Sequence, residues 1–299
     1  MPAIPSYPFS FAGLDAPADA AAVRFVVLPI PYDGTATWQK GADRGPEAIL
    51  DASGYMELYD IETGLEPFQA GIVTAAPIDC PPDPERMVER VRSAALAIID
   101  GGQTLVGLGG EHSVSIGLIQ AHAACYPGLS VLQFDAHSDT RDAYEGSRHN
   151  HACVMARAAE VADFVQVGIR SLDRSEMGLY RPERTFFAHD IGGGYDFIPS
   201  MVDRLGEHVY ITIDLDCLDP AFMPSTGTPE PGGLGWYQLT RAVAAAVRHR
   251  NVVGFDVVEL LPNPANRAPD FLAAKLVYQI MGYMVARQKG VATWINASS

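Results

Sequence analysis

Short runs of apolar residues alternate along the chain with longer segments of helical periodicity. The runs are almost continuously apolar, as in parallel strands that are covered on both faces. We predict strands at Phe25–Leu28, Thr104–Gly107, Ser130–Phe134, Phe164–Val167, His208–Ile213 and Val252–Val257. Helices are predicted between them, at Asp83–Asp100, Ser113–Ala124, Leu239–Arg248 and Asp270–Arg287. This alternation predicts an α/β protein with three layers, α/β/α, around a central and mostly parallel sheet.

No internal repeat, low-complexity tract or convincing linker interrupts this pattern. We therefore predict a single domain over residues 1–299, for which a hydrophobic content of 48% supplies enough apolar material. The segment Met1–Ala22 has no basic part followed by an apolar run, so no signal peptide is expected. No stretch approaches the ~20 consecutive apolar residues of a membrane-spanning helix.

Polar side chains follow four of the predicted strands at the point where each strand ends. Gly-Gly-Glu-His at 109–112 follows the second predicted strand, and Asp-Ala-His-Ser-Asp at 135–139 follows the third. Asp214 and Asp216 follow the fifth, and Glu259 follows the sixth. Open parallel sheets bind ligands beyond the carboxyl ends of their strands. These groups are therefore expected to meet at one edge of the sheet.

Asp135, His137 and Asp139 alternate with small residues. In extended backbone all three side chains point to one face. Two carboxylates placed in this way repel each other unless a cation lies between them. The alternative is a polar loop in which one aspartate caps a helix. The recurrence of the pattern in Asp214-x-Asp216, at another strand end, favours a metal site.

Asp214-x-Asp216 is a weak signal by itself, because the pattern is common in loops and helix caps. It leads into a segment rich in Pro and Gly, which extends to Gly233. Such a loop holds one conformation and suits the wall of a preorganised site, although a purely structural loop is the alternative. His112 is a lone histidine after two glycines, and the carboxylates around it favour a ligand over a core residue. A phosphate-binding loop is not expected, because no Walker lysine or Gly-x-Gly-x-x-Gly fingerprint follows.

The candidate ligands are thus two imidazoles and four carboxylates: His112, Asp135, His137, Asp139, Asp214 and Asp216. Oxygen donors with some nitrogen favour Mn²⁺ and disfavour a structural zinc site. Six side chains are too many for one catalytic ion that keeps open positions, whereas two ions bridged by two carboxylates use all of them. Two ions ~3.5–4 Å apart can hold a bridging water and lower its pKa until it is hydroxide near neutral pH.

Charge and cysteine content narrow the classes of function. The net charge is −15, from 36 acidic and 21 basic residues, which argues against nucleic acid as a partner. An acidic chain suits metal ions or a cationic substrate, although a solvated acidic surface explains the charge equally well. Scattered cysteines without paired spacing predict buried, reduced thiols in a cytoplasmic protein: Cys80, Cys125, Cys153 and Cys217.

These motifs resemble the ureohydrolase family, which includes arginases and agmatinases, and they look closest to bacterial agmatinases. The resemblance extends from about Val27 to the C-terminus. It is carried by Gly-Gly-Glu-His at 109–112, Phe-Asp-Ala-His-Ser-Asp at 134–139, Asp-Leu-Asp-Cys-Leu-Asp-Pro at 214–220 and Thr-Pro-Glu-Pro-Gly-Gly at 228–233. The residues Pro31–Gly34 and Gly41–Pro46 are similar to the family's N-terminal region.

The resemblance implies an arginase-like fold with two Mn²⁺ ions per subunit, and a homo-oligomer, as relatives form trimers or hexamers. One ion would be held by His112, Asp135, Asp139 and Asp214. The other would be held by Asp135, His137, Asp214 and Asp216, so that two of the aspartates bridge. A metal-bridging hydroxide would then hydrolyse a guanidinium to urea and an amine. Metal charge would stabilise the tetrahedral intermediate.

By the same resemblance, three residues have catalytic roles. Glu259 aligns with the glutamate that pairs with the substrate guanidinium, which a carboxylate can receive bidentately. His151 aligns with the histidine that passes protons to the departing amine. The family's usual His-Gly is His151-Ala152 here, and His149 lies two residues upstream, so both histidines stay open for this role. Asp139 is the third expected catalytic residue, in addition to its place among the ligands.

The likeness to agmatinases implies hydrolysis of agmatine to putrescine and urea, in polyamine biosynthesis. Arg141 stands where arginase typically has asparagine. It could pair with a substrate carboxylate, as in guanidinobutyrate, but we expect it to point into solvent. Asp173 could match the residue through which arginase contacts the amino group of its substrate. Guanidinobutyrate, arginine and formiminoglutamate therefore stay open as substrates.

Two other classes of protein compete with this interpretation. A single-zinc amide hydrolase of the deacetylase type needs an Asp-x-His pair and one later aspartate, which leaves Asp139, Asp216 and Glu259 without a purpose. A non-catalytic regulator is expected to have lost ligands, yet all six are present. The sequence therefore favours an enzyme that acts on a small cationic guanidino compound, with no nucleic-acid or membrane partner.

Overall fold

In the computed structural model, residues 10–15 and 22–291 are described, and most of Met1–Ala22 lies outside them. The described residues form one eight-stranded sheet in the order β2-β1-β3-β8-β7-β4-β5-β6, and every neighbouring pair is parallel. The strands are β1 (Phe25–Ile30), β2 (Ile72–Thr74), β3 (Thr104–Gly109), β4 (Ser130–Phe134), β5 (Asp163–Ile169), β6 (Thr185–Phe187), β7 (His208–Asp214) and β8 (Asn251–Val258). The predicted α/β class with a parallel sheet is confirmed.

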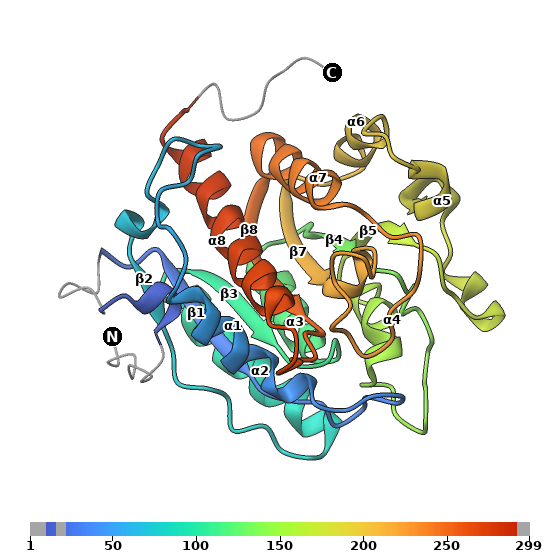
Figure 1. Cartoon of the computed structure of the whole chain (residues 1–299). Helices are drawn as coiled ribbons and strands as arrows, with labels where there is room; N and C mark the ends of the chain where they lie inside the picture. Colours follow the sequence, from blue (N-terminus) through green and yellow to red (C-terminus); the bar gives the residue numbers. More distant parts are fainter. Residues whose placement is uncertain (1–9, 16–21, 292–299) are drawn as a thin grey trace.

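Helices cover both faces of the sheet (Figure 1). They are α1 (Gly45–Ser53), α2 (Pro84–Asp100), α3 (Val114–Cys125), α4 (Val154–Ala158), α5 (Ala188–Ile191), α6 (Phe197–Asp203), α7 (Trp236–His249) and α8 (Ala268–Gln288). One hydrophobic core joins the sheet to α1, α7 and α8, and a second joins the other face to α2, α3 and α4. The three predicted layers are therefore present, while a single domain over residues 1–299 stays a prediction.

Short 3-10 helices occupy several of the connections. They are η1 (Phe11–Gly13), η3 (Ala42–Arg44), η4 (Pro67–Ala70), η5 (His151–Cys153), η6 (Arg174–Gly178), η7 (Pro182–Arg184) and η8 (Leu215–Cys217). Three of them, η5, η6 and η8, follow or flank the carboxyl ends of the strands and help to shape the site described below.

The four predicted helices are α2, α3, α7 and α8, with ends shifted by up to three residues. The start of α2 shows why its boundary was readable: the side chain of Asp83 accepts a hydrogen bond from the backbone N–H of Arg86 at 2.9 Å, and Pro84 occupies the first turn. The edge strands β2 and β6 were not predicted. Each has only three residues, too few to show a period in the sequence.

The carboxyl ends of the four central strands lie side by side. Leu108 of β3 pairs with Val257 of β8, Val257 pairs with Ile213 of β7, and Ile213 pairs with Phe134 of β4. The chain leaves each strand within two residues of this row. All four polar segments that follow these strands therefore begin at the same edge of the sheet, as the sequence predicts.

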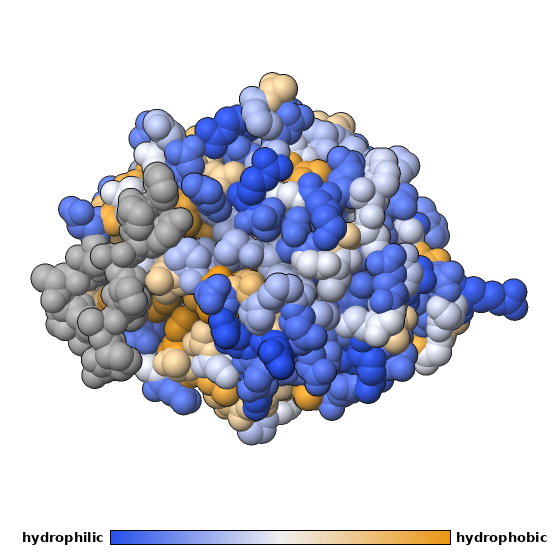
Figure 2. Space-filling view, turned by 90° about the horizontal axis from the view of Figure 1, so that it is seen from below, coloured by the Kyte–Doolittle hydropathy of each residue, from blue (hydrophilic) through white to orange (hydrophobic). Residues whose placement is uncertain are grey.

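Polar residues make up most of the visible surface of the molecule (Figure 2). The face shown in Figure 2 is mostly hydrophilic, with smaller apolar areas between the polar groups. Among the described residues, no helix combines the length and apolar character that crossing a lipid bilayer requires. The four cysteines are free thiols, as expected from their spacing. The expected burial is right for Cys153 and Cys217 and wrong for Cys80 and Cys125, which are partly exposed.

Burial of His122 makes the stability of the fold depend on pH. The ring lies in α3 against Tyr210, with ring centroids 4.4 Å apart, and its Nδ1 is 2.8 Å from the carbonyl oxygen of Leu118. Its Nε2 has no hydrogen-bond partner among the described residues. Burial lowers the pKa of His122 from 6.5 to about 4. Between about pH 6.5 and about pH 4, His122 therefore binds a proton in the unfolded chain but stays neutral in the folded chain.

We expect the free energy of unfolding to fall by about 3 kcal/mol, through His122 alone, as the pH drops from about 6.5 to about 4. His122→Leu should remove this part of the pH dependence. Urea unfolding of the wild type and the variant at about pH 7.5 and about pH 4.5 measures it. His189→Gln, at an exposed histidine, is the control. Equal losses in the wild type and His122→Leu would contradict this role.

Candidate metal centre

His112 follows β3 through a turn that needs glycine. A Cβ atom on Gly110 would lie 1.9 Å from the carbonyl oxygen of Tyr32, so no other residue fits without moving the backbone. The amide of Gly110 donates to the carbonyl of Ile30 at 2.9 Å, and the amide of Glu111 donates to that of Tyr32 at 2.7 Å. This close contact with the loop after β1 aims His112 at the sheet edge.

The segment after β4 brings Asp135, His137 and Asp139 to the same place. The amide of His137 donates to Asp135 Oδ1 at 2.6 Å. Asp139 has a φ of 54°, in the left-handed region that non-glycine residues rarely adopt. Its carbonyl accepts the amide of Met155 at 2.9 Å, so α4 holds the backbone in this conformation. Such strained residues occur most often at functional sites.

Asp214 and Asp216 come from the end of β7 and from η8. Asp214 Oδ1 accepts the amide of Asp216 at 2.9 Å, and Asp216 Oδ1 accepts the amide of Ala136 at 3.0 Å. The guanidinium of Arg170 fixes the loop from behind, since its Nη2 donates to the carbonyls of Asp216 at 2.7 Å and Glu230 at 2.8 Å. Backbone and guanidinium donors therefore set the position of both carboxylates.

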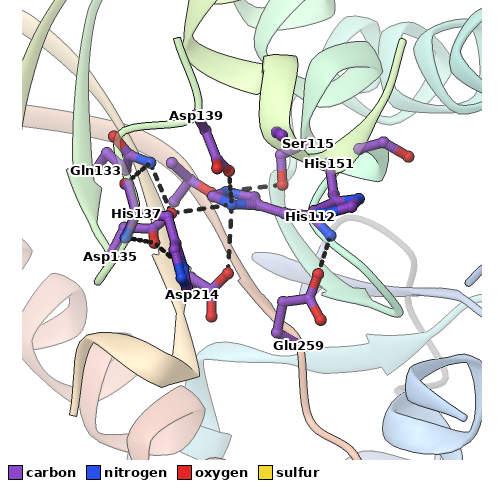
Figure 3. A network of polar contacts seen from close by, with 12 residues as sticks. His112, Ser115, Gln133, Asp135, His137, Asp139, His151, Asp214 and Glu259 are labelled. Carbon is purple, nitrogen blue, oxygen red and sulfur yellow. Dashed lines mark hydrogen bonds and ion pairs between the residues drawn. The ribbon is translucent and has the colours of Figure 1, made fainter. Parts of the chain in front are cut away.

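The structure brings all six residues that the sequence predicts as ligands into one cluster. Figure 3 labels five of them, all but Asp216. His112 Nδ1 lies 3.1 Å from Asp135 Oδ2, 3.0 Å from Asp139 Oδ2 and 3.5 Å from Asp214 Oδ2. His137 Nδ1 lies 2.9 Å from Asp216 Oδ2 and 3.6 Å from Asp135 Oδ1. Two groups of ligand atoms, each within 4.8 Å, share Asp135. This arrangement suits two adjacent ions.

The protonation equilibria show how crowded the negative charge is. Burial raises the pKa of Asp214 well above its usual value, and the charges of Asp216 and Asp135 raise it further. Burial and the charge of Asp135 raise the pKa of Asp139 to about 7. Burial also acts to raise the pKa of Asp135, but the adjacent imidazoles of His112 and His137 outweigh it and lower that pKa. A bound cation would relieve this repulsion directly.

The donor set fits a divalent metal. His112 Nδ1 is buried among carboxylate oxygens, yet it makes no hydrogen bond of acceptable geometry. An orphaned ring nitrogen of this kind is unfavourable unless it meets a cation or a donor. The remaining donors are carboxylate oxygens and one further imidazole, with no thiolate among them. Such a set matches Mn²⁺ and similar hard ions better than structural zinc.

Residues that were not identified from the sequence set the ring orientation of His112, through the ring nitrogen that faces away from the carboxylates. Thr212 Oγ1 donates to Asp256 Oδ1 at 2.7 Å, which leaves its oxygen to accept the Nε2–H of His112 at 2.9 Å. Tyr210 donates to the other oxygen of Asp256 at 2.6 Å. This tautomer leaves the lone pair of His112 Nδ1 pointing at the carboxylates, as a metal ligand requires.

A second buried chain of hydrogen bonds reaches Asp135. The amide of Gln133 donates to Asp135 Oδ2 at 2.7 Å (Figure 3), and the amide of Gln166 donates to Gln133 Oε1 at 2.6 Å and to the carbonyl of Ser138 at 2.8 Å. Gln133 and Gln166 are fully or almost fully buried. The sequence offered one sign of these two residues: each is a polar residue inside an otherwise apolar strand, β4 or β5.

A cavity of about 290 Å³ opens onto the cluster and is lined by five of the charged groups: His112, His137, Asp139, Asp214 and Glu259. Glu259 follows β8 directly with a φ of 65°, and its Oε1 accepts the amide of His112 at 2.8 Å (Figure 3). Burial raises the pKa of Glu259 well above its usual value, and the charge of Glu111 adds to this effect. A cationic group in the cavity would reverse this shift.

The two histidines considered for proton transfer lie in different places. His151 lines the cavity, and its ring packs edge-on against Tyr144 at 6.1 Å. Burial lowers the pKa of His151. His149 instead lines separate surface hollows that include Asp83 and Glu85.

Arg141 does not point into solvent, so that expectation was wrong. Its side chain is 31% exposed and lines the cavity, because its guanidinium stacks 4.6 Å from the ring of Tyr144 and lies 4.0 Å from Glu176. Glu176 is buried and accepts the amide of Thr140 at 2.9 Å. Asp173 lies exposed at the cavity wall, where hydrogen bonds from Ser175 lower its pKa.

Comparisons with known proteins agree with this geometry. The family model described as the arginase family matches residues 23–282. The chain is 38% identical over 283 residues to the N(1)-aminopropylagmatine ureohydrolase of Synechocystis sp., covering 91% of this chain and 92% of the relative. It is 42% identical over 279 residues to the protein of that name from Thermus thermophilus, covering 91% and 93%. The crystal structure of agmatine ureohydrolase of Thermoplasma volcanium superimposes with a TM-score of 0.82 at 30% identity, covering 91% of this chain and 94% of that one.

Gln133→Leu should weaken metal binding, because it removes the amide that holds Asp135. We expect Mn²⁺ affinity to fall about 10- to 100-fold, as for other residues that support metal ligands. Isothermal titration of the metal-stripped protein with Mn²⁺ measures this change. Gln279→Leu is the matched control, because Gln279 is also buried but belongs to α8, away from the residues that line the cavity. Equal affinities for the two variants would contradict the role of Gln133.

Proposed function

The chain belongs to the arginase family, and from this premise we propose that it hydrolyses the guanidino group of N(1)-aminopropylagmatine or agmatine to urea and an amine. It is a hydrolase that acts on carbon–nitrogen bonds of linear amidines, like its ureohydrolase relatives. The observation that carries the proposal is the cluster of six ligand-type side chains, four of which line one cavity together with Glu259. A deacetylase-like or regulatory protein would not need this complete set.

We propose that the cluster holds two Mn²⁺ ions, since manganese binding is general for the family. The first would be held by His112, Asp135, Asp139 and Asp214, and the second by Asp135, His137, Asp214 and Asp216. The nitrogen–oxygen distances of 2.9–3.6 Å support the first set, and the second set apart from Asp214, because donors that close can surround one small ion. The place of Asp214 in the second set rests on the family resemblance. When bound, the ions supply positive charge and lower the pKa of a water at the site.

Glu259 is the residue that we propose to receive the guanidinium. Its carboxylate lines the cavity and is held by the amide of His112, so it is already oriented before the substrate arrives. A guanidinium offers paired N–H donors and a positive charge, which suit a carboxylate whose pKa is raised by burial and by Glu111. Resonance makes the guanidinium carbon a poor electrophile, so holding it in one orientation is a large part of the chemistry.

His151 is the residue that we propose to move the proton to the leaving amine. Burial lowers its pKa, which keeps the ring neutral and able to accept a proton near neutral pH. Its position in the cavity wall supports it over His149, which lines other hollows. Asp139 contributes through its charge and its strained backbone, which holds the carboxylate 3.0 Å from His112 Nδ1.

The cavity wall favours a cationic tail on the substrate. Asp173 is exposed there and its pKa is lowered by Ser175, so it stays ionised. Arg141 stacks on Tyr144 and lies 4.0 Å from Glu176, so part of its charge is already compensated before a carboxylate, as in guanidinobutyrate, could reach it. Agmatine and N(1)-aminopropylagmatine both have cationic tails. The sequence motifs alone favour agmatine as the substrate. The names of the two relatives at 38% and 42% identity favour N(1)-aminopropylagmatine over agmatine.

Both amine products are polyamines, so we place the reaction in polyamine synthesis. A trimeric or hexameric assembly stays a prediction from the family resemblance.

The proposal is tested by urea release from a panel of compounds with the Mn²⁺-loaded protein. N(1)-aminopropylagmatine should give the highest kcat/KM, followed by agmatine. Arginine and guanidinobutyrate carry carboxylates and should be poorer by about tenfold or more, since an unpaired carboxylate near Asp173 is unfavourable. Formiminoglutamate, whose hydrolysis gives formamide instead of urea, is assayed by glutamate formation and should be poorer for the same reason. Asp135→Asn, which removes one proposed bridging charge, is the inactive control. No urea from any of these compounds would overturn the proposed function.

Glu259→Gln should impair recognition of the guanidinium, since the amide keeps the size of the side chain and loses its charge. We expect kcat/KM to fall about 10- to 100-fold, the range of a charge-assisted hydrogen bond. Steady-state kinetics with the best substrate of the panel measure this fall, and Mn²⁺ content should stay at the wild-type level. Glu207→Gln, at an exposed glutamate, is the control. Unchanged kinetics would remove Glu259 from the site.

A further inference from the structure

Thr35 contacts His151 although 116 residues separate the two in sequence. It lies on the loop after β1, and none of the roles proposed above involves it. Its Oγ1 accepts the backbone amide of His151 at 3.0 Å and lies 3.3 Å from the ring nitrogen Nδ1. One hydroxyl therefore contacts both the backbone and the ring of the histidine that faces the cavity.

Glu111 holds this hydroxyl in place. Its carboxylate is fully buried and accepts four hydrogen bonds from two residues. Thr35 donates to Oε1 from its hydroxyl at 2.9 Å and from its amide at 3.2 Å. Ser113 donates to Oε1 from its hydroxyl and to Oε2 from its amide, both at 2.8 Å. An acceptor with so many donors fixes the loop and the threonine rotamer together.

These contacts determine which ring nitrogen of His151 carries hydrogen. The single hydroxyl hydrogen of Thr35 is directed at Glu111, which as a carboxylate can only accept. Toward His151 the threonine oxygen is therefore an acceptor. A neutral imidazole has one N–H and one lone pair. The favourable arrangement puts the hydrogen on Nδ1, which leaves the lone pair on Nε2.

We propose that Thr35 is a positioning residue for His151: its hydroxyl, anchored on Glu111, holds the ring as the Nδ1–H tautomer, so that Nε2 is the atom that exchanges a proton with the substrate. This inference rests on the proposed function, in which His151 transfers the proton. The logic is that of a base oriented by an acceptor on its far nitrogen, with a hydroxyl between the ring and the buried carboxylate. Thr35 itself does not touch the reacting atoms.

The decisive variants are Thr35→Val, which keeps the shape and removes the hydroxyl, and Thr35→Ser, which keeps the hydroxyl. Thr35→Val should lower kcat about tenfold or more, within the range of general acid–base catalysis, while KM changes by less than about threefold. Thr35→Ser should restore most of kcat. Mn²⁺ content should be the same in all proteins, because Thr35 contacts none of the proposed ligands.

Thr63→Val is the matched control. Thr63 is a buried threonine whose hydroxyl, like that of Thr35, donates to a carboxylate, that of Asp60, but neither Thr63 nor Asp60 lines the cavity. Its kcat should equal that of the wild type. A fall in kcat for Thr63→Val as large as that for Thr35→Val would overturn the proposal, because it would show a general effect of losing a buried hydroxyl.

A measurement without turnover separates this inference from the proposed function. Nitrogen-15 NMR of the metal-free protein with labelled histidine reports the tautomer of each ring, and His151→Gln assigns the signals. Wild type and Thr35→Ser should show His151 protonated on Nδ1, whereas Thr35→Val should show a mixture of tautomers. Wild-type protein that releases no urea, yet shows this difference, would refute the function and keep the positioning. An active enzyme with the same tautomer in wild type and Thr35→Val would refute the positioning alone.

Discussion

The structure depends on one electrostatic constraint, the convergence of four carboxylates at the ends of two neighbouring strands. Asp135 and Asp139 follow β4, Asp214 ends β7 and Asp216 lies in η8, and all four are nearly or completely buried. Buried like charges at this separation are unfavourable by several kcal/mol unless a cation or protons compensate them. The raised pKa of Asp214 and of Asp139 expresses this cost. Two imidazoles among the carboxylates reduce the cost in part, and two divalent ions would remove most of it.

Much of the surrounding structure serves to hold these charges in place. Gln133 and Gln166 supply amide donors from inside the sheet, and Arg170 clamps the loop of η8 through backbone carbonyls. Thr212 fixes the tautomer of His112. Gln133, Gln166 and Thr212 are polar and buried, so each is unfavourable unless it is fully hydrogen-bonded. The network thereby links the correct geometry of the site to the correct packing of the sheet.

The difference between local sequence patterns and long-range contacts explains how much of the structure the sequence could reveal. Strand ends are readable because an apolar run stops and a polar group follows, and this was enough to predict that Asp135, Asp214 and Glu259 meet at one edge. The order of the strands was not readable, since it depends on long-range pairing. Thr35 was not identified because a loop threonine has no distinctive pattern around it.

Arg141 was placed wrongly in solvent for a related physical reason. Its environment is created by Tyr144, close in sequence, and by Glu176, which approaches through a loop that the sequence does not position. A charged residue in a loop is exposed by default, and only the tertiary partner reverses this expectation. The short strands β2 and β6 escaped prediction similarly, because their pairing with β1 and β5, and not their composition, makes them strands.

The distribution of charge around the cavity also limits what the substrate can be. The metal ions would neutralise the inner carboxylates, but Glu259 and Asp173 lie on the cavity wall outside the proposed ligand sets. A molecule with a positive charge at each end can compensate both, with the guanidinium at Glu259 and an ammonium near Asp173. An amino acid tail would add a carboxylate to a wall whose arginine already stacks on Tyr144 and lies 4.0 Å from Glu176. In the proposed function, charge compensation would thus connect metal binding by the inner carboxylates with selection of a cationic tail near Asp173.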